Sequence, residues 1–141
     1  AASDVYKRQC LDWARENFSL NGIDPATQYF CKGDVRRWLE RFSRQGRTFH
    51  GIILDPPTFS RDDRGRVFRV ESHYGELVAQ ARECLEPGGW MLCTSNCRKL
   101  SHADFRRMVA EALPGFRLTH DPMPPDFTGE DYLKRLWIDW K

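Results

Sequence analysis

The sequence of 141 residues lacks a long apolar run, a strong excess of either charge and any repeat or low-complexity tract. Its longest apolar stretch is a few residues, far short of the roughly 18 that a membrane-spanning helix needs. Lys and Arg number 22 against 20 Asp and Glu, so the net charge of +2 does not by itself indicate a polyanion partner. With 40% hydrophobic residues, the composition excludes disordered and fibrous classes and predicts one globular domain without a membrane span.

Paired cysteine motifs are also lacking. The five cysteines are odd in number, scattered and form no C-x-x-C pair, namely Cys10, Cys31, Cys84, Cys93 and Cys97. This pattern disfavours both a disulfide framework and a zinc site, and the four histidines show no metal-ligand spacing. We therefore expect reduced thiols, no metal and a cytoplasmic location.

The first nine residues, AASDVYKRQ, do not begin with Met and differ in character from the rest of the chain. We interpret residues 1–9 as a non-native leader. From Cys10 the pattern becomes helical, because Leu11, Ala14 and Phe18 share one face, and Asn21-Gly22 is expected to end this helix.

The remaining sequence alternates apolar strands with amphipathic helices. The expected elements are strands at Thr27–Cys31, Phe49–Leu54, Trp90–Thr94, Phe116–Thr119 and Tyr132–Trp140, and helices at Val35–Phe42, Ser72–Leu85 and Ser101–Leu113. Ser101, three residues before Asp104, is expected to cap the last of these helices. The continuous apolar run Phe49–Leu54 predicts a strand buried on both faces in the middle of a parallel sheet, and Ser60–Arg66 is expected to be a polar loop. This order predicts an α/β fold with a doubly wound parallel sheet that ends in a hairpin-like pair, and such sheets bind ligands at the carboxyl ends of their strands.

The most specific feature comes directly after the strand Phe49–Leu54, where the chain reads Asp55-Pro56-Pro57-Thr58-Phe59. Two prolines remove two backbone donors and stiffen the loop, so its carbonyls and the Asp55 carboxylate form a rigid acceptor surface. An amino group could be held there, and Phe59 could stack on a planar base. A rigid turn without further function explains the same residues.

Polar residues come after the neighbouring strands as well. Asp34 can accept a hydrogen bond from an exocyclic amine while Val35 contacts a flat ring, although Asp34 can equally cap the next helix. After the strand Trp90–Thr94, Asn96 could bind a base, and Cys97 is either a nucleophile activated by Arg98 and Lys99 or a bystander thiol.

A group of basic residues surrounds this predicted edge of the sheet. Its members could each neutralise a phosphate of RNA, namely Arg61, Arg64, Arg66, Arg69, Arg98 and Lys99. Acidic residues are interleaved with them, so a solvated loop is the competing interpretation.

Five stretches occur in register along the chain, namely Leu11–Gly22 (LDWARENFSLNG), the Gly33-Asp34-Val35 turn, Ile52–Ser60 with its DPPTFS, the LEPGG turn and Thr94–Arg98 (TSNCR). Together they resemble the class I S-adenosylmethionine (SAM)-dependent methyltransferases that modify large-subunit ribosomal RNA, and the match is closest to the group that methylates guanine N7 or cytosine C5. The resemblance implies a Rossmann-like fold, mostly parallel with an antiparallel C-terminal strand.

The resemblance also implies roles for individual residues. Asp34 and Val35 would flank the cofactor adenine, and Asp55, Pro56, Pro57 and Phe59 would form the acceptor loop beside the methyl group and the base. The nucleophile of the cytosine C5 members aligns with Asn96, one residue before Cys97, so the sequence is more similar to the nitrogen-methylating branch.

The sequence departs from this family near its start and before the third predicted helix. No residue is matched to the acidic one that would bind the cofactor ribose, since Asp4 lies about one position out of register. The glycine-rich cofactor loop, with its strand and helix, is not present, so residues 10–141 are expected to be the C-terminal two-thirds of such a domain, inactive alone and with an uncovered sheet edge. Ser72 and His73 stand where relatives carry a basic and an acidic residue. The alternatives are a methyltransferase for amino groups of DNA or protein and a noncatalytic RNA-binding fragment.

Overall fold

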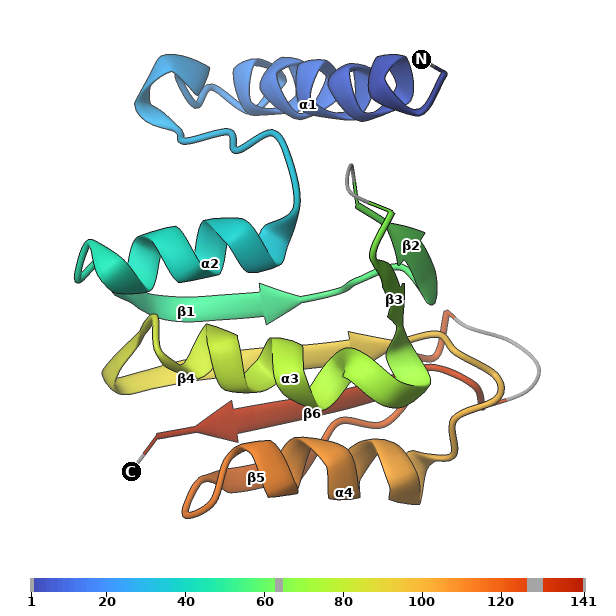
Figure 1. The fold of residues 1–141 in the computed structure, drawn as a ribbon. Helices are drawn as coiled ribbons and strands as arrows, with labels where there is room; N and C mark the ends of the chain where they lie inside the picture. Colours follow the sequence, from blue (N-terminus) through green and yellow to red (C-terminus); the bar gives the residue numbers. More distant parts are fainter. Residues whose placement is uncertain (1, 63–64, 127–130, 141) are drawn as a thin grey trace. The chain divides into compact units, whose positions relative to one another are not determined.

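The chain divides after Asp34 into two units, residues up to Asp34 and residues from Val35 onward. The computed structural model describes residues 2–62, 65–126 and 131–140, which include helices, a four-stranded sheet and a small hairpin (Figure 1). Within these residues, no helix has the length and apolar character needed to cross a membrane.

The first unit consists of the long helix α1 (Ala2–Leu20) and a short 3-10 turn, η1 (Pro25–Thr27). After α1 the chain turns at Gly22, whose positive φ of 72° requires glycine's freedom. The Phe18 ring meets Phe30 edge-on at 5.7 Å, and the Arg15 guanidinium lies 4.8 Å from the Phe30 ring centre. The predicted start of this helix at Cys10 was wrong, because α1 begins at Ala2; the assignment of residues 1–9 as a leader stays a prediction.

The predicted strand Thr27–Cys31 was also wrong. Asp24 caps η1 by accepting from the Ala26 amide at 2.9 Å, and the Thr27 amide donates to the Asp24 carbonyl at 3.1 Å. The Gln28 amide donates to the Pro25 carbonyl, so the turn has already used backbone donors that a strand would need. Residues 28–31 form neither helix nor strand.

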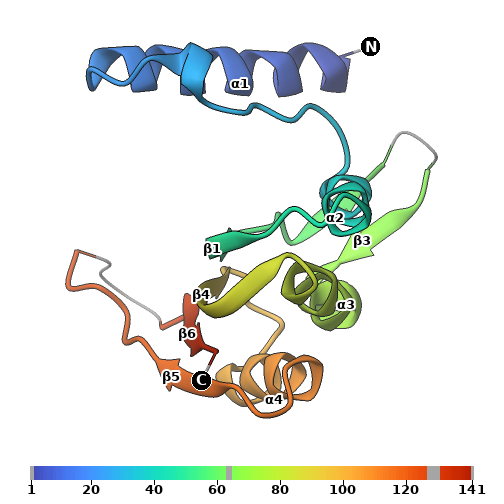
Figure 2. The same ribbon diagram turned by 90° about the vertical axis from the view of Figure 1, so that its left-hand side faces the viewer.

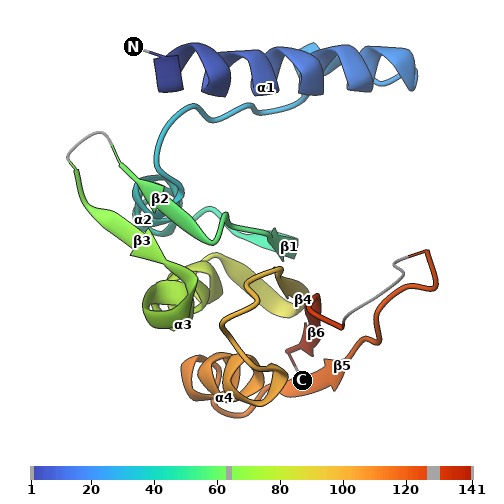
Figure 3. The same cartoon turned by 90° about the vertical axis from the view of Figure 1, so that its right-hand side faces the viewer.

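The second unit contains a sheet in the order β1-β4-β6-β5, formed by Phe49–Leu54, Leu85–Ser95, Lys134–Asp139 and Arg117–His120. Strands β1 and β4 run parallel, whereas β6 is antiparallel to both β4 and β5. The expected α/β class, the antiparallel C-terminal strand and the final hairpin-like pair are confirmed. The expectation of a mostly parallel, doubly wound sheet was wrong for this unit, because only β1 and β4 of its described strands pair in parallel and its helices lie on one face of the sheet (Figures 2 and 3).

Three helices, α2 (Val35–Arg44), α3 (Val70–Arg82) and α4 (His102–Ala112), lie on the same face of the sheet, as the two side views show (Figures 2 and 3). Ser101 caps α4 as predicted, since its hydroxyl accepts from the Asp104 amide at 3.0 Å. Helix α3 presents Tyr74, Leu77, Val78 and Ala81 to the core at helical spacing.

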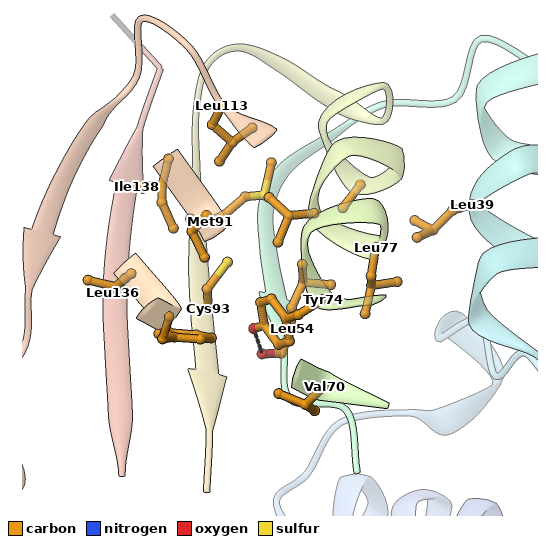
Figure 4. Close-up of a cluster of buried hydrophobic side chains, with 14 of the residues drawn as sticks. Leu39, Leu54, Val70, Tyr74, Leu77, Met91, Cys93, Leu113, Leu136 and Ile138 are labelled. Atoms are coloured by element: carbon orange, nitrogen blue, oxygen red, sulfur yellow. Dashed lines mark hydrogen bonds between the residues drawn. The ribbon is translucent and has the colours of Figure 1, made fainter. Parts of the chain in front are cut away.

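The core fills the space between these helices and the sheet (Figure 4). Strand β4 alternates, so that Met91, Cys93 and Ser95 are buried on the helix-covered face while the residues between them are only half-buried. Leu136 and Ile138 of β6 join the same core. Two-sided burial was wrongly predicted for β1, which is the end strand of the sheet and leaves the Ile53 side chain 64% exposed.

The predicted polar loop Ser60–Arg66 was wrong in part, since it contains strand residues. Strands β2 (Phe59–Arg61) and β3 (Val67–Arg69) pair in antiparallel fashion, with Phe59 opposite Arg69. The Asp62 carboxylate accepts from the Arg66 amide at 2.8 Å and closes the turn end of this hairpin. The hairpin projects between the end of β1 and the start of α3 (Figures 1 and 3).

Candidate functional site

The parallel pair β1 and β4 brings two loops to one edge of the sheet. Leu54 is in register with Cys93, so Asp55 leaves β1 beside the residues with which β4 ends. The Thr94 hydroxyl donates to the Asp55 carboxylate at 2.6 Å, and the Thr58 hydroxyl donates to the Asn96 side-chain oxygen at 3.2 Å. One side-chain hydrogen bond therefore connects residues 55–59, the proline loop, to the end of β4, and a second connects it to the loop after β4.

The start of the proline loop is fixed from within the core. Tyr74 is fully buried, and its hydroxyl donates to the Leu54 carbonyl at 3.0 Å. Since Pro56 and Pro57 have fixed φ angles and no amide hydrogen, this anchor and the bond from Thr94 hold the Asp55 carboxylate at the strand end. The Asp55 side chain remains exposed there and can still accept hydrogen bonds.

Phe59 lies at the base of the hairpin between two arginines. The guanidinium carbons of Arg69 and Arg61 lie 5.1 and 5.8 Å from the centre of the Phe59 ring, within the range of cation–π contacts. The ring is 45% exposed, so it offers an aromatic surface bordered by positive charge. This combination suits stacking by an unpaired base whose phosphates lie nearby.

A cavity of about 360 Å³ opens between the hairpin and the loop after β4. Its lining residues are Thr58, Phe59, Arg69, Glu71, Asn96, Cys97, Arg98 and Lys99. The volume is within the roughly 300–1,000 Å³ of small-ligand sites. The structure thus brings together Phe59, Arg69, Asn96, Arg98 and Lys99, whereas Asp55 and the two prolines lie outside the lining.

Other predicted residues stand apart from this cavity. Arg66 donates from Nε to the Asp62 carboxylate at 2.6 Å, and Arg64 lies outside the described residues. Asp34 is the last residue of the first unit, so its place in a cofactor site stays a prediction. Val35 begins α2 and is 48% exposed.

No known family model matches this chain. The ribosomal RNA large subunit methyltransferase K/L of Pseudomonas putida is 37% identical over 131 residues, which cover 90% of this chain and 17% of that protein. The protein of the same description from Shewanella amazonensis is 30% identical over 129 residues, or 91% of this chain and 18% of that protein. The chain is a distant homologue of one part of the K/L methyltransferases. It spans less than a fifth of their length.

Solved structures of methyltransferases share the fold of this chain. A protein described as a methyltransferase, crystallised in complex with S-adenosylhomocysteine, superposes with a TM-score of 0.77 at 26% identity over 86% of this chain and 34% of that chain. A SAM-dependent methyltransferase from Agrobacterium tumefaciens has a TM-score of 0.74 at 23% identity over 94% of this chain and 46% of its own, and shows the shared fold.

Cys93 and Cys97 of this K/L homologue are both buried, but only one of them lines the cavity. Burial raises the pKa of Cys93 to about 12, and this side chain packs in the core. Cys97 lines the cavity yet is only 2% exposed. Its burial is that of a packed side chain rather than of an exposed thiolate nucleophile. Among the residues that the structure describes, no cluster of His, Cys, Asp or Glu is placed to hold a metal ion.

Sequence reasoning missed four residues that build this site of the K/L homologue. Tyr74 and Thr94 position the proline loop, and Glu71 adds a carboxylate to the cavity. Lys134 donates a hydrogen bond to the Cys97 carbonyl in the loop after β4. Tyr74 has a core position in an amphipathic helix, and Lys134 sits in an alternating strand, so neither pattern signals a polar role. The position of Glu71, two residues after the predicted cluster member Arg69, was the one available signal.

Proposed function

We propose that this chain forms the base-binding part of a SAM-dependent methyltransferase that modifies a base of large-subunit ribosomal RNA. The observation that carries the proposal is the cavity at the strand ends, where one aromatic ring, one carboxylate and three basic side chains meet. Homology to the K/L methyltransferases supports the reaction class and the RNA substrate.

Each group in the cavity has a role that fits an unpaired nucleotide. Phe59 stacks on the base, and Arg69, Arg98 and Lys99 neutralise the phosphates on either side of it. Asn96 and Glu71 supply acceptors for the polar edge of the base. The Asp55 carboxylate, held by Thr94, accepts from an amino group at the end of β1.

The cofactor of this reaction is SAM, whose sulfonium supplies an activated methyl group. Asp34, Val35 and Asp55 are the residues of this chain that would hold it. Val35 offers exposed apolar surface to a flat ring, and the exposed Asp55 carboxylate accepts from amine donors, which fits such a ligand. The chain's contribution to the rate is alignment of the base nitrogen, because an activated methyl group needs little proton chemistry.

The site favours a base nitrogen as the methyl acceptor. Methylation of cytosine C5 needs a cysteine that adds to the ring, and the Cys97 thiol is buried with both of its backbone groups hydrogen-bonded. We expect Cys97→Ser to retain methyl transfer, and trapping of Cys97 on RNA that contains 5-fluorocytosine would reverse this assignment.

Methyl transfer by the full-length product of the gene tests the proposal. Transfer of a tritiated methyl group from SAM to large-subunit ribosomal RNA is compared between the wild type and Asp55→Ala, with Glu111→Ala on the exposed face of α4 as the control. We expect Asp55→Ala to lose about 100-fold in rate, as typical for a preorganised polar group, and the control to keep it. Equal rates in all three proteins would reject the role of the proline loop.

A noncatalytic RNA-binding protein is the second candidate, favoured by the three basic residues of the cavity. It predicts RNA binding by the full-length product without binding of SAM, which calorimetric titration measures. Methylation of DNA or protein in preference to ribosomal RNA would instead identify an amino-group methyltransferase with another substrate.

A further inference from the structure

Lys134, the first residue of β6, is a lysine buried almost completely, with 2% of its surface exposed. Its ammonium donates to the Cys97 carbonyl at 2.6 Å and to the Tyr132 carbonyl at 2.7 Å. Burial of a charge costs several kcal/mol unless polar groups replace its water shell, and here backbone carbonyls do so. The two carbonyls belong to the loop that leaves β4 and to the segment that enters β6.

Cys97, in the loop after β4, is held by the buried side chains of Ser95 and Lys134. The Cys97 amide donates to the Ser95 hydroxyl at 3.2 Å, and its carbonyl accepts from Lys134. Ser95 and Lys134 are the polar residues that the described part of the chain buries below 3% exposure. Cys97 is therefore fixed through its backbone, while its neighbours Asn96 and Arg98 are exposed and line the cavity.

The contact partner on the other side is also connected to the cavity. The guanidinium carbon of Arg98 lies 4.5 Å from the centre of the Tyr132 ring. Lys134 thus binds the backbone of the residue on which Arg98 stacks and the backbone of the residue before Arg98. The Lys134 ammonium therefore binds the backbone at or next to both partners of the contact between Arg98 and Tyr132.

We propose that Lys134 is a positioning residue of the RNA site, which fixes the loop backbone at Cys97 and Tyr132 and thereby sets Asn96 and Arg98 at the cavity. Its action on the loop follows from the hydrogen bonds alone, and only its effect on RNA rests on the proposed function. Lys134 itself is not expected to contact base or phosphate, since the residue is buried and its ammonium donates to two backbone carbonyls.

Alkylation of the five cysteines, followed residue by residue with mass spectrometry, tests the effect on the loop in this chain. We expect Lys134→Met to raise the alkylation rate of Cys97 about tenfold or more, because local opening of the loop then controls access, while Cys84 and Cys93 stay protected. Lys99→Met is the matched control, because it removes the same charge from the same loop at an exposed position and leaves Cys97 protected.

Two outcomes would overturn the positioning role of Lys134. One is an unchanged Cys97 rate in Lys134→Met, and the other is an equal increase at Cys84, Cys93 and Cys97, which shows an effect on the whole core. Ser95→Ala provides a second variant, because it removes the hydroxyl from the Cys97 amide and leaves the ammonium in place. Cys97 stays more protected in Ser95→Ala than in Lys134→Met if the ammonium is the main anchor, and the reverse order contradicts it.

Fluorescence anisotropy with a short single-stranded RNA measures the consequence for binding. We expect Lys134→Met to weaken binding about tenfold, and to keep most of this loss at high salt because loop geometry is not screened. The loss in Lys99→Met should instead fade as salt rises. If the wild type binds no RNA, the proposed function fails, whereas the alkylation result still decides the role of Lys134 in the loop.

Discussion

Tyr74→Phe tests the anchor of the proline loop with the smallest possible change. The hydroxyl of Tyr74 donates to the Leu54 carbonyl at 3.0 Å in the core, and the substitution removes this donor alone. The ring keeps its edge-on contact with Phe105, whose centre lies 4.9 Å away, so no large cavity forms. The cost is therefore the lost hydrogen bond to the Leu54 carbonyl, which is left without this donor in the core, together with the lost contact of the hydroxyl with the Cys93 thiol.

The magnitude follows from these two contributions. A neutral buried hydrogen bond and the desolvation of its abandoned acceptor together cost about 1–3 kcal/mol, and the Thr94 hydroxyl, 3.4 Å from the same carbonyl, offsets part of this. We expect a loss of about 1–2 kcal/mol in the free energy of unfolding, or roughly 3–6 °C in Tm for a chain of this size.

Urea titration followed by tryptophan fluorescence measures this loss. The m value should stay constant, because the surface exposed on unfolding does not change. Tyr132→Phe, at a half-buried position, is the matched control and should stay within about 0.5 kcal/mol of the wild type. A loss below about 0.3 kcal/mol in Tyr74→Phe would refute the reasoning, since it would mean that the hydroxyl does not anchor the strand end.

Two further predictions concern the core and the sheet. Burial raises the pKa of Cys93 from 9.0 to about 12, so between these pH values the folded state keeps a proton that the unfolded state releases, and the free energy of unfolding should fall as pH rises from about 9 to 12. Cys93→Ala should flatten this decline by up to about 1.4 kcal/mol per pH unit in urea titrations across that range. An unchanged slope would contradict the burial of the thiol. Gly89→Ala should lower the free energy of unfolding by about 1–3 kcal/mol, because the new Cβ would lie 2.7 Å from the His50 carbonyl oxygen and 2.9 Å from that of Glu86. Gly75→Ala is the control, since its Cβ would contact the flexible Met108 side chain at 3.2 Å, and the same titration should show a small change. Equal stabilities of the two variants would contradict the packing described.

Sequence periodicity predicted most helices and strands of the second unit, because each of them buries one side in the core and its apolar residues recur at regular spacing. The strand Phe49–Leu54 was predicted with the bounds it has, and Ser101 was identified as a cap from its spacing to Asp104. The direction of strand pairing carries no such signal. The alternation in β6 is the same for a parallel and an antiparallel neighbour, and the apolar run of β1 does not reveal that Ile53 is exposed at the sheet edge.

The candidate site was predicted where chemistry comes directly after a strand along the chain. Phe59, Asn96, Arg98 and Lys99 were found in this way, and the structure places them around one cavity. Contacts between residues far apart in sequence could not be found, among them Thr94 with Asp55 and Lys134 with Cys97. These bonds depend on register between strands, which the sequence of one chain does not specify by local pattern.

Photo-crosslinking tests the central claim most directly, namely that the cavity between the hairpin and the loop after β4 receives an RNA base. The chain is irradiated with large-subunit ribosomal RNA that contains 4-thiouridine, and the crosslinked peptides are identified by mass spectrometry. The account predicts crosslinks at Phe59 and within residues 96–99. Crosslinks confined to basic residues away from the cavity, such as Arg107 of α4 and Arg117 of β5, would contradict it.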